Sequence, residues 1–264
     1  LKLDDWTRLD KLKDGDRVAI PRAMPIFGNL NISDDKLIVL AHMIGDGCYV
    51  KRQPLHYTNS DMKLISIVQD SATNEFAIKT KIVKQENWYH LYLSSKQKLA
   101  RGIRNPIVKW LDEELGIYGQ HSREKVIPNQ IFELNNDKIR LFLKHLWATD
   151  GSITTQIGTK SKVNIYYASG NHELVNQVQH LLLRLGIISS VSSSSKKGYE
   201  DMWNVNIMGK VEQTRFLKIV GCVGEKEKQV EKAQQFLKGI SENPNNDVIP
   251  KEIWNNIKEI LLDK

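Results

Sequence analysis

The sequence predicts a mixed α/β (α+β) protein made of two pseudo-symmetric halves, each with the element order αββαββα. Two segments support this prediction, because residues 40–47 and 143–151 are apolar runs that both end in Asp-Gly. Their aspartates, Asp46 and Asp150, lie 104 positions apart in the 264-residue chain. Each run is followed by the same order of strand-like and helix-like segments. This indicates a duplication that contributes one carboxylate from each copy.

The first half is predicted to begin with a helix after Ser33, a residue type preferred at the N-cap. Asp34 and Asp35 follow in the first turn, where acidic side chains suit the helix dipole. The apolar run through Ala41 predicts a buried helix. Gly47 ends it, because glycine is preferred just past a helix C-terminus. The rest of this half is predicted as two strands, a helix, two strands and a helix, at 48–58, 60–72, 76–94 and 105–116.

The second half repeats this order. Asn135 or Asn136 caps a helix that runs through Thr149, and Asn171 caps a later helix that Gly186 ends. The remaining assignments are strands at 152–157 and 162–168, a helix at 172–185, strands at 187–194 and 202–208, and a helix at 210–220. We therefore divide the chain into a separate N-terminal segment (1–24), a first half (25–134), a second half (135–239) and a helical tail (240–264).

Charge and composition favour a polyanionic partner without requiring one. Lys and Arg number 38 against 31 Asp and Glu, which gives a formal charge of +7. Hydrophobic residues make up 41% of the chain, enough for a substantial core. No apolar stretch is long enough to span a membrane, and no signal peptide opens the chain. We therefore expect a cytoplasmic protein with no membrane partner.

Several kinds of site are not predicted. The two cysteines, Cys48 and Cys222, are too few for a disulfide framework or a structural zinc site, so we expect reduced packing residues. His42, His145 and His172 are interpreted as structural helix residues, because no His/Cys cluster has zinc spacing. The chain also lacks a GxxxxGK[ST] phosphate-binding loop.

The first Asp-Gly helix has small residues on one face. Ala41 and Gly45 lie four positions apart, and this spacing lets a second helix approach closely. The second copy departs from this pattern, because Lys144 and His145 stand where small residues are expected and Thr149 corresponds to Gly45. We therefore expect two paired helices whose interface is not fully symmetric. A pseudo-twofold site of this kind suits a twofold substrate, such as a DNA duplex cut on both strands.

The paired segments resemble the signature of LAGLIDADG homing endonucleases in their single-chain form, over about residues 33–235. Residues 1–22 resemble the end of the N-terminal splicing block of an intein, most clearly from Trp6 to Arg22, with inteins of replicative helicases as the nearest type. The resemblance implies a saddle-shaped DNA-binding sheet and a monomeric, site-specific endonuclease. Such an enzyme cuts double-stranded DNA of the uninterrupted host gene, in a bacterial or phage-type host, and leaves 3′ overhangs. Splicing itself is not expected, because Leu1 and Asp263-Lys264 stand where it requires Cys or Ser and His-Asn.

The resemblance also implies the metal site. Asp46 and Asp150 would hold Mg²⁺ against the scissile phosphates, and Ca²⁺ or Mn²⁺ would be able to substitute. The backbone carbonyls of Gly45 and Thr149 would assist. A nuclease of this type would use the bound cations to activate water and stabilise the leaving oxygen.

A lysine late in each half is implied as a further catalytic residue, which would polarise water or neutralise charge on the phosphate. In the first half this is Lys125, which begins the segment Lys-Val-Ile-Pro. In the second half the candidates are Lys226 and Lys228. Both follow Asp150 at nearly the spacing at which Lys125 follows Asp46, and we favour Lys226.

DNA reading would fall to the strands, where Arg and Gln suit base edges and Lys suits phosphates. The first-half candidates are Lys51, Arg52, Gln53, His56, Lys79, Lys81 and Lys84. The second-half candidates are Thr154, Gln156, Lys160, Lys162, Lys196, Lys197, Asn204 and Asn206. Two alternatives remain open: a catalytically silent DNA- or RNA-binding module of the maturase or regulator type, and a purely structural splicing fragment. Relatives of the first kind often lose an acid, and both acids are present here.

Overall fold

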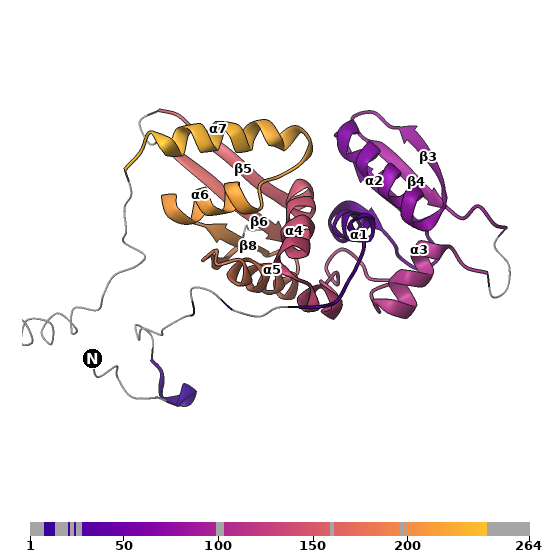
Figure 1. Cartoon of the computed structure of the whole chain (residues 1–264), viewed down its shortest axis with the longest axis horizontal. Helices are drawn as coiled ribbons and strands as arrows, with labels where there is room; N and C mark the ends of the chain where they lie inside the picture. The colour runs from indigo at the N-terminus through magenta and orange to yellow at the C-terminus, as the bar shows by residue number, and fades with distance from the viewer. Residues whose placement is uncertain are drawn as a thin grey trace, which may run out of the picture. The chain divides into compact units, whose positions relative to one another are not determined.

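The structure is a computed structural model, and it describes residues 8–13, 21, 24, 28–98, 103–158, 161–195, 198 and 200–241 (Figure 1). The chain divides into two compact units, Arg22–Ser241 and a smaller unit of Leu1–Pro21 with Glu242–Lys264. In the smaller unit the structure describes one 3-10 turn, Leu9–Lys11, beside an ion pair of Arg8 with Asp10. Most of the predicted N-terminal segment and of the predicted tail lies outside the described residues. The larger unit contains both predicted halves.

The first half has the predicted order of elements. They are α1 (Asp34–Asp46), β1 (Gly47–Cys48), β2 (His56–Asn59), α2 (Met62–Phe76), β3 (Lys79–Lys84), β4 (Tyr89–Ser94) and α3 (Pro106–Lys109), which continues as a π-helical turn, Trp110–Glu114. The strands pair antiparallel in the order β1-β2-β4-β3. Ser33 caps α1 by accepting a hydrogen bond from the backbone N–H of Lys36, as the sequence predicts.

The second half repeats this topology with strand order β5-β6-β8-β7. A 3-10 turn (Asn129–Glu133) leads into α4 (Asn136–Asp150), β5 (Gly151–Gln156), β6 (Lys162–Ser169), α5 (His172–Arg184), β7 (Ser190–Ser194), β8 (Met202–Ile207) and α6 (Lys210–Ile219). A second 3-10 turn, η4 (Gly224–Lys226), then leads into α7 (Glu227–Lys238). None of the helices in these described segments is long and apolar enough to cross a membrane.

Several element boundaries differ from the prediction. Helix α2 continues to Phe76 instead of ending at 72, because Phe76 packs on Trp110 with ring centroids 5.3 Å apart and Ala77 ends the helix in the left-handed region. Strand β7 begins at Ser190 instead of 187. The backbone N–H of Ile187 bonds to Leu182 at the end of α5, and this residue is therefore not part of the ladder.

Each sheet has one buried face and one accessible face. In the first sheet Tyr57 and Leu91 are completely buried, and in the second sheet Tyr167 and Val205 are. Side chains alternate along a strand, so the intervening residues point to the opposite face. We call these the open faces. They carry the partly or fully exposed side chains His56, Thr58, Lys79, Lys81, His90 and Tyr92 in the first sheet and Thr154, Gln156, Lys162, Asn164, Asn204 and Asn206 in the second.

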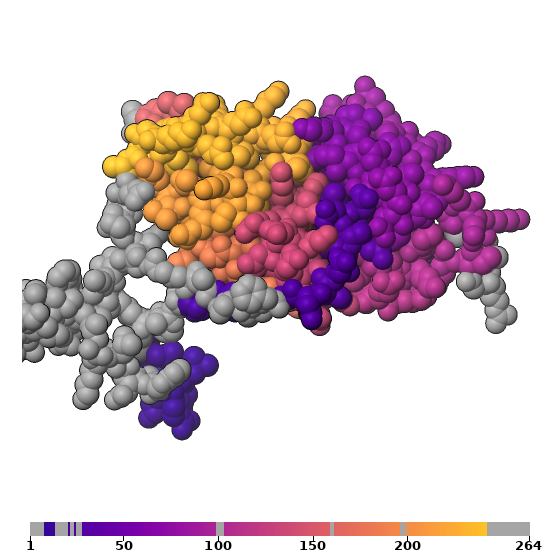
Figure 2. Space-filling view, viewed as in Figure 1, coloured from indigo at the N-terminus to yellow at the C-terminus, as the bar shows by residue number. Residues whose placement is uncertain are grey.

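Helices α1 and α4 pack side by side and join the halves (Figure 1). The space-filling view shows the halves in direct contact (Figure 2). The helices approach most tightly at the predicted small residue, since a Cβ built on Gly45 would lie 2.1 Å from Thr149 Oγ1 and 2.4 Å from its Cβ. Thr149, which breaks the symmetry of the sequence pattern, therefore occupies the space that Gly45 leaves empty.

This contact predicts a paired effect on stability. Gly45→Ala should lower the free energy of unfolding by about 1–3 kcal/mol, because the added methyl overpacks the helix interface. Combining it with Thr149→Gly removes the atoms that the methyl meets, and part of the loss should return, although a glycine in a helix costs about 1 kcal/mol relative to alanine. Denaturant unfolding of Gly45→Ala, of Thr149→Gly and of the double variant measures this. Strictly additive losses would contradict the contact.

Two glycines end α1 and α4 for a reason other than the predicted one. Gly47 and Gly151 follow the helices, as predicted, but both have extended backbones (φ −85° and −77°) and not the left-handed conformation. A Cβ on Gly47 would lie 2.5 Å from the Cα of Met43, and one on Gly151 would lie 2.2 Å from the Trp147 ring. Close approach of the preceding turn therefore excludes a side chain at both positions.

Candidate active site

Two carboxylates meet where α1 and α4 end. Asp46 and Asp150 are the last residues of these helices, and the residues that precede them are in contact. The pKa of Asp46 is raised to about 6, first because burial disfavours the ionised form and second because of the negative charge of Asp150. The pKa of Asp150 is also raised by loss of hydration, although Lys125 and Lys226 oppose this shift. The acids from the two halves therefore lie in one electrostatic site.

Asn59, which the sequence analysis missed, orients the first carboxylate. Its side-chain amide donates to Asp46 Oδ2 at 2.8 Å, and its amide oxygen accepts from the backbone N–H of Asp61 at 2.8 Å. The corresponding position in the second half is Ser169, whose hydroxyl accepts from the backbone N–H of Asn171 instead. The two acids therefore differ in their side-chain partners. An asparagine between a strand and a helix ordinarily indicates a turn, and only the register of β2 places it beside Asp46.

Lys125 is buried and lies at the C-terminus of α1. Its Nζ donates to the backbone carbonyls of Met43 (3.1 Å), Gly45 (2.9 Å) and Gly47 (2.7 Å). An ammonium has three N–H groups, so these carbonyls use all of them. The lysine satisfies the unpaired carbonyls of the helix end and fixes the backbone on both sides of Asp46. Burial lowers the pKa of Lys125 to about 8, while Asp150 and Asp46 favour its charged form.

Lys226 has the same position at the end of α4. Its Nζ donates to the carbonyls of Ala148 (2.9 Å), Thr149 (2.7 Å) and Gly151 (2.7 Å), and a fourth carbonyl, that of Trp147, lies at 3.4 Å. Of the two second-half candidates, the structure thus brings Lys226 to the site, while Lys228 lies in the first turn of α7. Each half contributes one acid and one lysine that holds the acid's helix end.

A buried histidine pair crosses the interface between α1 and α4. His42 Nε2 lies 3.1 Å from His145 Nδ1, and His42 Nδ1 lies 3.0 Å from the hydroxyl of Tyr57. These contacts agree with the structural role predicted for both histidines, but the sequence did not predict that they would meet. They are 103 positions apart, one fewer than the repeat, so aligning the halves does not pair them.

The family model described as the LAGLIDADG-like domain matches residues 137–221. The chain carries a LAGLIDADG-like domain. The matched segment contains most of α4, Asp150, the whole second sheet and α6. The solved structure of I-DmoI in complex with DNA and Ca has the same fold, with a TM-score of 0.50 and 18% identity, over 71% of this chain and 88% of that chain. The two halves together thus have the fold of I-DmoI, with one four-stranded sheet in each half and a pair of helices between them.

Curated relatives place the LAGLIDADG-like chain inside longer proteins. It is 37% identical to the replicative DNA helicase DnaB of Nostoc sp. (strain PCC 7120), over 97% of this chain and 30% of the helicase. It is also 26% identical to the replication factor C small subunit of Methanocaldococcus jannaschii, over 92% of this chain and 12% of that protein. The chain therefore spans less than a third of the length of the relatives that it matches.

The LAGLIDADG-like site offers a donor set that suits a hard divalent cation. Two carboxylates and several backbone carbonyls meet there, and carboxylate oxygens are the ligands that Mg²⁺ and Ca²⁺ prefer. In the described part of the chain no three His, Cys, Asp or Glu side chains group together as a metal site, so no thiolate or imidazole site competes. The carbonyls of Gly45 and Thr149, predicted to assist the metal, accept here from Lys125 and Lys226.

The DNA-binding candidates of the LAGLIDADG-like chain fall into four groups. His56, Lys79, Lys81, Thr154, Gln156, Lys162, Asn204 and Asn206 lie on the open faces. Lys51, Arg52 and Gln53 lie in the exposed turn between β1 and β2 and not in a strand, because the ladder ends at Cys48 and resumes at His56. Lys84 shares the face of Thr80, which bonds to Gln69 of α2, so strand alternation removes it from the open face. Lys160, Lys196 and Lys197 lie outside the described residues.

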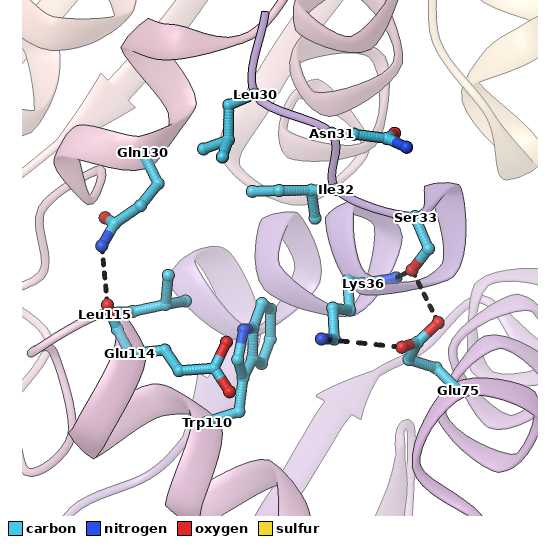
Figure 3. Close-up of a pocket in the computed structure, with 10 residues that line it drawn as sticks. All are labelled: Leu30, Asn31, Ile32, Ser33, Lys36, Glu75, Trp110, Glu114, Leu115 and Gln130. Carbon is cyan, nitrogen blue, oxygen red and sulfur yellow. Dashed lines mark hydrogen bonds and ion pairs between the residues drawn. The ribbon is translucent and has the colours of Figure 1, made fainter.

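A pocket at the other end of α1 does not belong to this site. Figure 3 shows Ser33, Lys36 and Glu75 linked by hydrogen bonds and an ion pair beside Trp110. At about 1.5 Å per helical residue, Ser33 lies about 20 Å from Asp46. Asp46 and Asp150 therefore do not line this pocket.

Proposed function

We propose that this chain is a site-specific double-strand DNA endonuclease of the homing type, which hydrolyses one phosphodiester in each strand with divalent cations. The observation that supports it is the meeting of Asp46 and Asp150 from duplicated halves, each with a lysine from its own half. A duplex has a pseudo-twofold axis, so a pseudo-twofold pair of acids presents one acid to each strand. The fold supports the proposal, because both acids lie between two open-faced sheets.

Asp46 and Asp150 would hold the cations, for which we propose Mg²⁺. Bound cations would supply an activated water and stabilise the leaving oxygen of the phosphodiester. Lys125 and Lys226 keep the two helix ends in position and partly neutralise the paired acids. Asn59 holds the carboxylate of Asp46 in one orientation. The charge of +7 and the lysines of the open faces would attract the DNA backbone.

The relatives indicate a target. A replicative helicase and a replication factor subunit share this segment although it makes up only 30% and 12% of their lengths, which is the pattern of an inserted element. We propose that the chain derives from such an insertion in a replicative helicase and cuts the helicase gene that lacks it. It would do so as a monomer in the bacterial cytoplasm, and it would leave 3′ overhangs.

The test is a supercoiled plasmid that carries the uninterrupted helicase junction, incubated with the purified chain. Linear product with Mg²⁺ and none with EDTA is the expected result, and a plasmid with a scrambled junction is the matched control. Gel-shift binding in both conditions with cutting in neither would identify a silent binding module instead. If the chain neither binds nor cuts the plasmid, the proposal is wrong and a purely structural fragment is favoured.

A further inference from the structure

The segments that carry Lys125 and Lys226 are each held in position by a hydrogen bond to a side chain of the opposite half. Asn171 Nδ2, in the second half, donates to the backbone carbonyl of Lys125 at 2.9 Å. Asp61 Oδ2, in the first half, accepts from the backbone N–H of Glu225, the neighbour of Lys226, at 2.7 Å. Asn171 and Asp61 are the N-caps of the equivalent helices α5 and α2. The amide oxygen of Asn171 accepts from the backbone N–H of Glu173, and Oδ1 of Asp61 accepts from the backbone N–H of Lys63.

Each lysine segment makes a further contact with the opposite half. The side-chain amide of Gln177 in α5 both accepts from the N–H of Ile127 (2.7 Å) and donates to its carbonyl (3.1 Å), two residues after Lys125. On the other side, Gly224 lies so close to Asp61 that a Cβ there would be 2.3 Å from Asp61 Oδ2. Gly224 also has a φ of +78°, a conformation that glycine adopts without strain. Both lysine segments thus depend on the other half for their position.

We infer that Asn171 and Asp61 are positioning residues, and that each of them fixes the position of the acid in the opposite half. Asn171 holds the Lys125 segment, Lys125 holds the carbonyls on both sides of Asp46, and Asp61 does the same for Lys226 and Asp150. Each N-cap therefore belongs to one half and controls the acid of the other. The inference rests on the proposed nuclease function and deepens it, because each substitution should then affect one DNA strand more than the other.

Asn171→Asp separates this role from helix capping. An ionised aspartate still accepts from Glu173 and is as good an N-cap as asparagine, but it cannot donate to the Lys125 carbonyl. The matched control is Asn105→Asp, because Asn105 caps α3 and its amide donates to the carbonyl of Leu93 at 2.8 Å, away from both lysines. For the segment that carries Lys226, Asp61→Asn leaves a single acceptor oxygen for two backbone N–H groups.

The first measurement is single-turnover nicking of a junction duplex with a different fluorophore on each strand. Asn171→Asp should change the ratio of the two strand rates roughly tenfold, because small misplacements of catalytic groups are costly. The change should be in the direction set by Lys125→Met, and Asp61→Asn should follow Lys226→Met in the opposite direction. Asn105→Asp should leave the ratio unchanged. An unchanged ratio in Asn171→Asp, or one that follows Lys226→Met, would overturn the inference.

A second measurement needs no DNA. In thermal unfolding, the losses from Asn171→Asp and Lys125→Met should be less than additive when combined, because both substitutions release the same segment. Additive losses would contradict the inference that Asn171 holds the segment that carries Lys125. If the wild-type chain cut no plasmid, the proposed function would fail while this cycle still decided the structural claim.

Discussion

Asp46→Asn and Asp150→Asn should each abolish double-strand cleavage, with rates falling by roughly 10³-fold or more. A carboxylate that holds a catalytic cation contributes several kcal/mol of transition-state stabilisation, and about 1.4 kcal/mol corresponds to a factor of ten in rate. DNA affinity should change little, because the open faces and not the acids make most of the predicted contacts. Single-turnover cleavage and gel-shift titration of the same junction duplex measure the two quantities.

The same substitution at Asp46 should not cost stability, and this separates a functional acid from a structural one. The folded-state pKa of about 6 lies above the ordinary 3.8, so ionising Asp46 at pH 7 opposes folding by up to ~3 kcal/mol. Asparagine removes that charge and keeps the shape. We therefore expect Asp46→Asn to unfold at an equal or higher denaturant concentration than wild type at pH 7. Asp35→Asn, in the first turn of the same helix, is the control and should retain activity. Full cleavage by either active-site variant would remove that acid from the mechanism.

The duplicated pattern sufficed to predict the fold and the position of Asp46 and Asp150 at equivalent helix ends, because both depend on local features. Buried apolar helices, caps and Asp-Gly ends are encoded within a few residues, and the second copy confirms the first. The register of β1 against β2 is not local in this sense. The pairing of these two strands is short, with Gly47 opposite Tyr57, and this pairing places Asn59 beside Asp46. No pattern in the intervening sequence specifies that return.

The choice between Lys226 and Lys228 illustrates the same limit. Spacing from Asp150 does not decide between them, because both lie near the distance seen in the first half. The decision is made by Gly224, whose positive φ starts a 3-10 turn, and by Asp61 of the other half, which fixes the turn. Contacts between halves depend on how α1 and α4 pack. These contacts between the halves cannot be predicted from the sequence of either half alone.

The buried histidine pair should make the fold sensitive to acid. Burial lowers the pKa of His145 to about 4 and that of His42 well below its usual 6.5; the charge of Lys144 lowers the pKa of His145 further, and His145 lowers that of His42. Below pH 6.5 the unfolded chain therefore binds protons that the folded chain does not, and stability falls until the folded pKa values are reached. Between pH 7.5 and 4.5, His145 alone should remove about 2–3 kcal/mol of unfolding free energy. Urea unfolding at pH intervals of half a unit measures this loss.

The chain itself provides the matched variant. The pseudo-equivalent of His42 is Leu146 and that of His145 is Ala41, so His42→Leu with His145→Ala places in each helix a residue type that the other copy tolerates. The double variant should show a smaller fall in stability between pH 6.5 and 4.5, whatever its stability at neutral pH. Asp46 contributes with the opposite sign in this range, because its raised pKa lets the folded chain take up a proton first, and it does so in both proteins. The difference between the two pH profiles therefore isolates the histidines. Parallel profiles would show that the pair is already charged or hydrated in the folded chain, and would contradict the burial of two neutral histidines between α1 and α4.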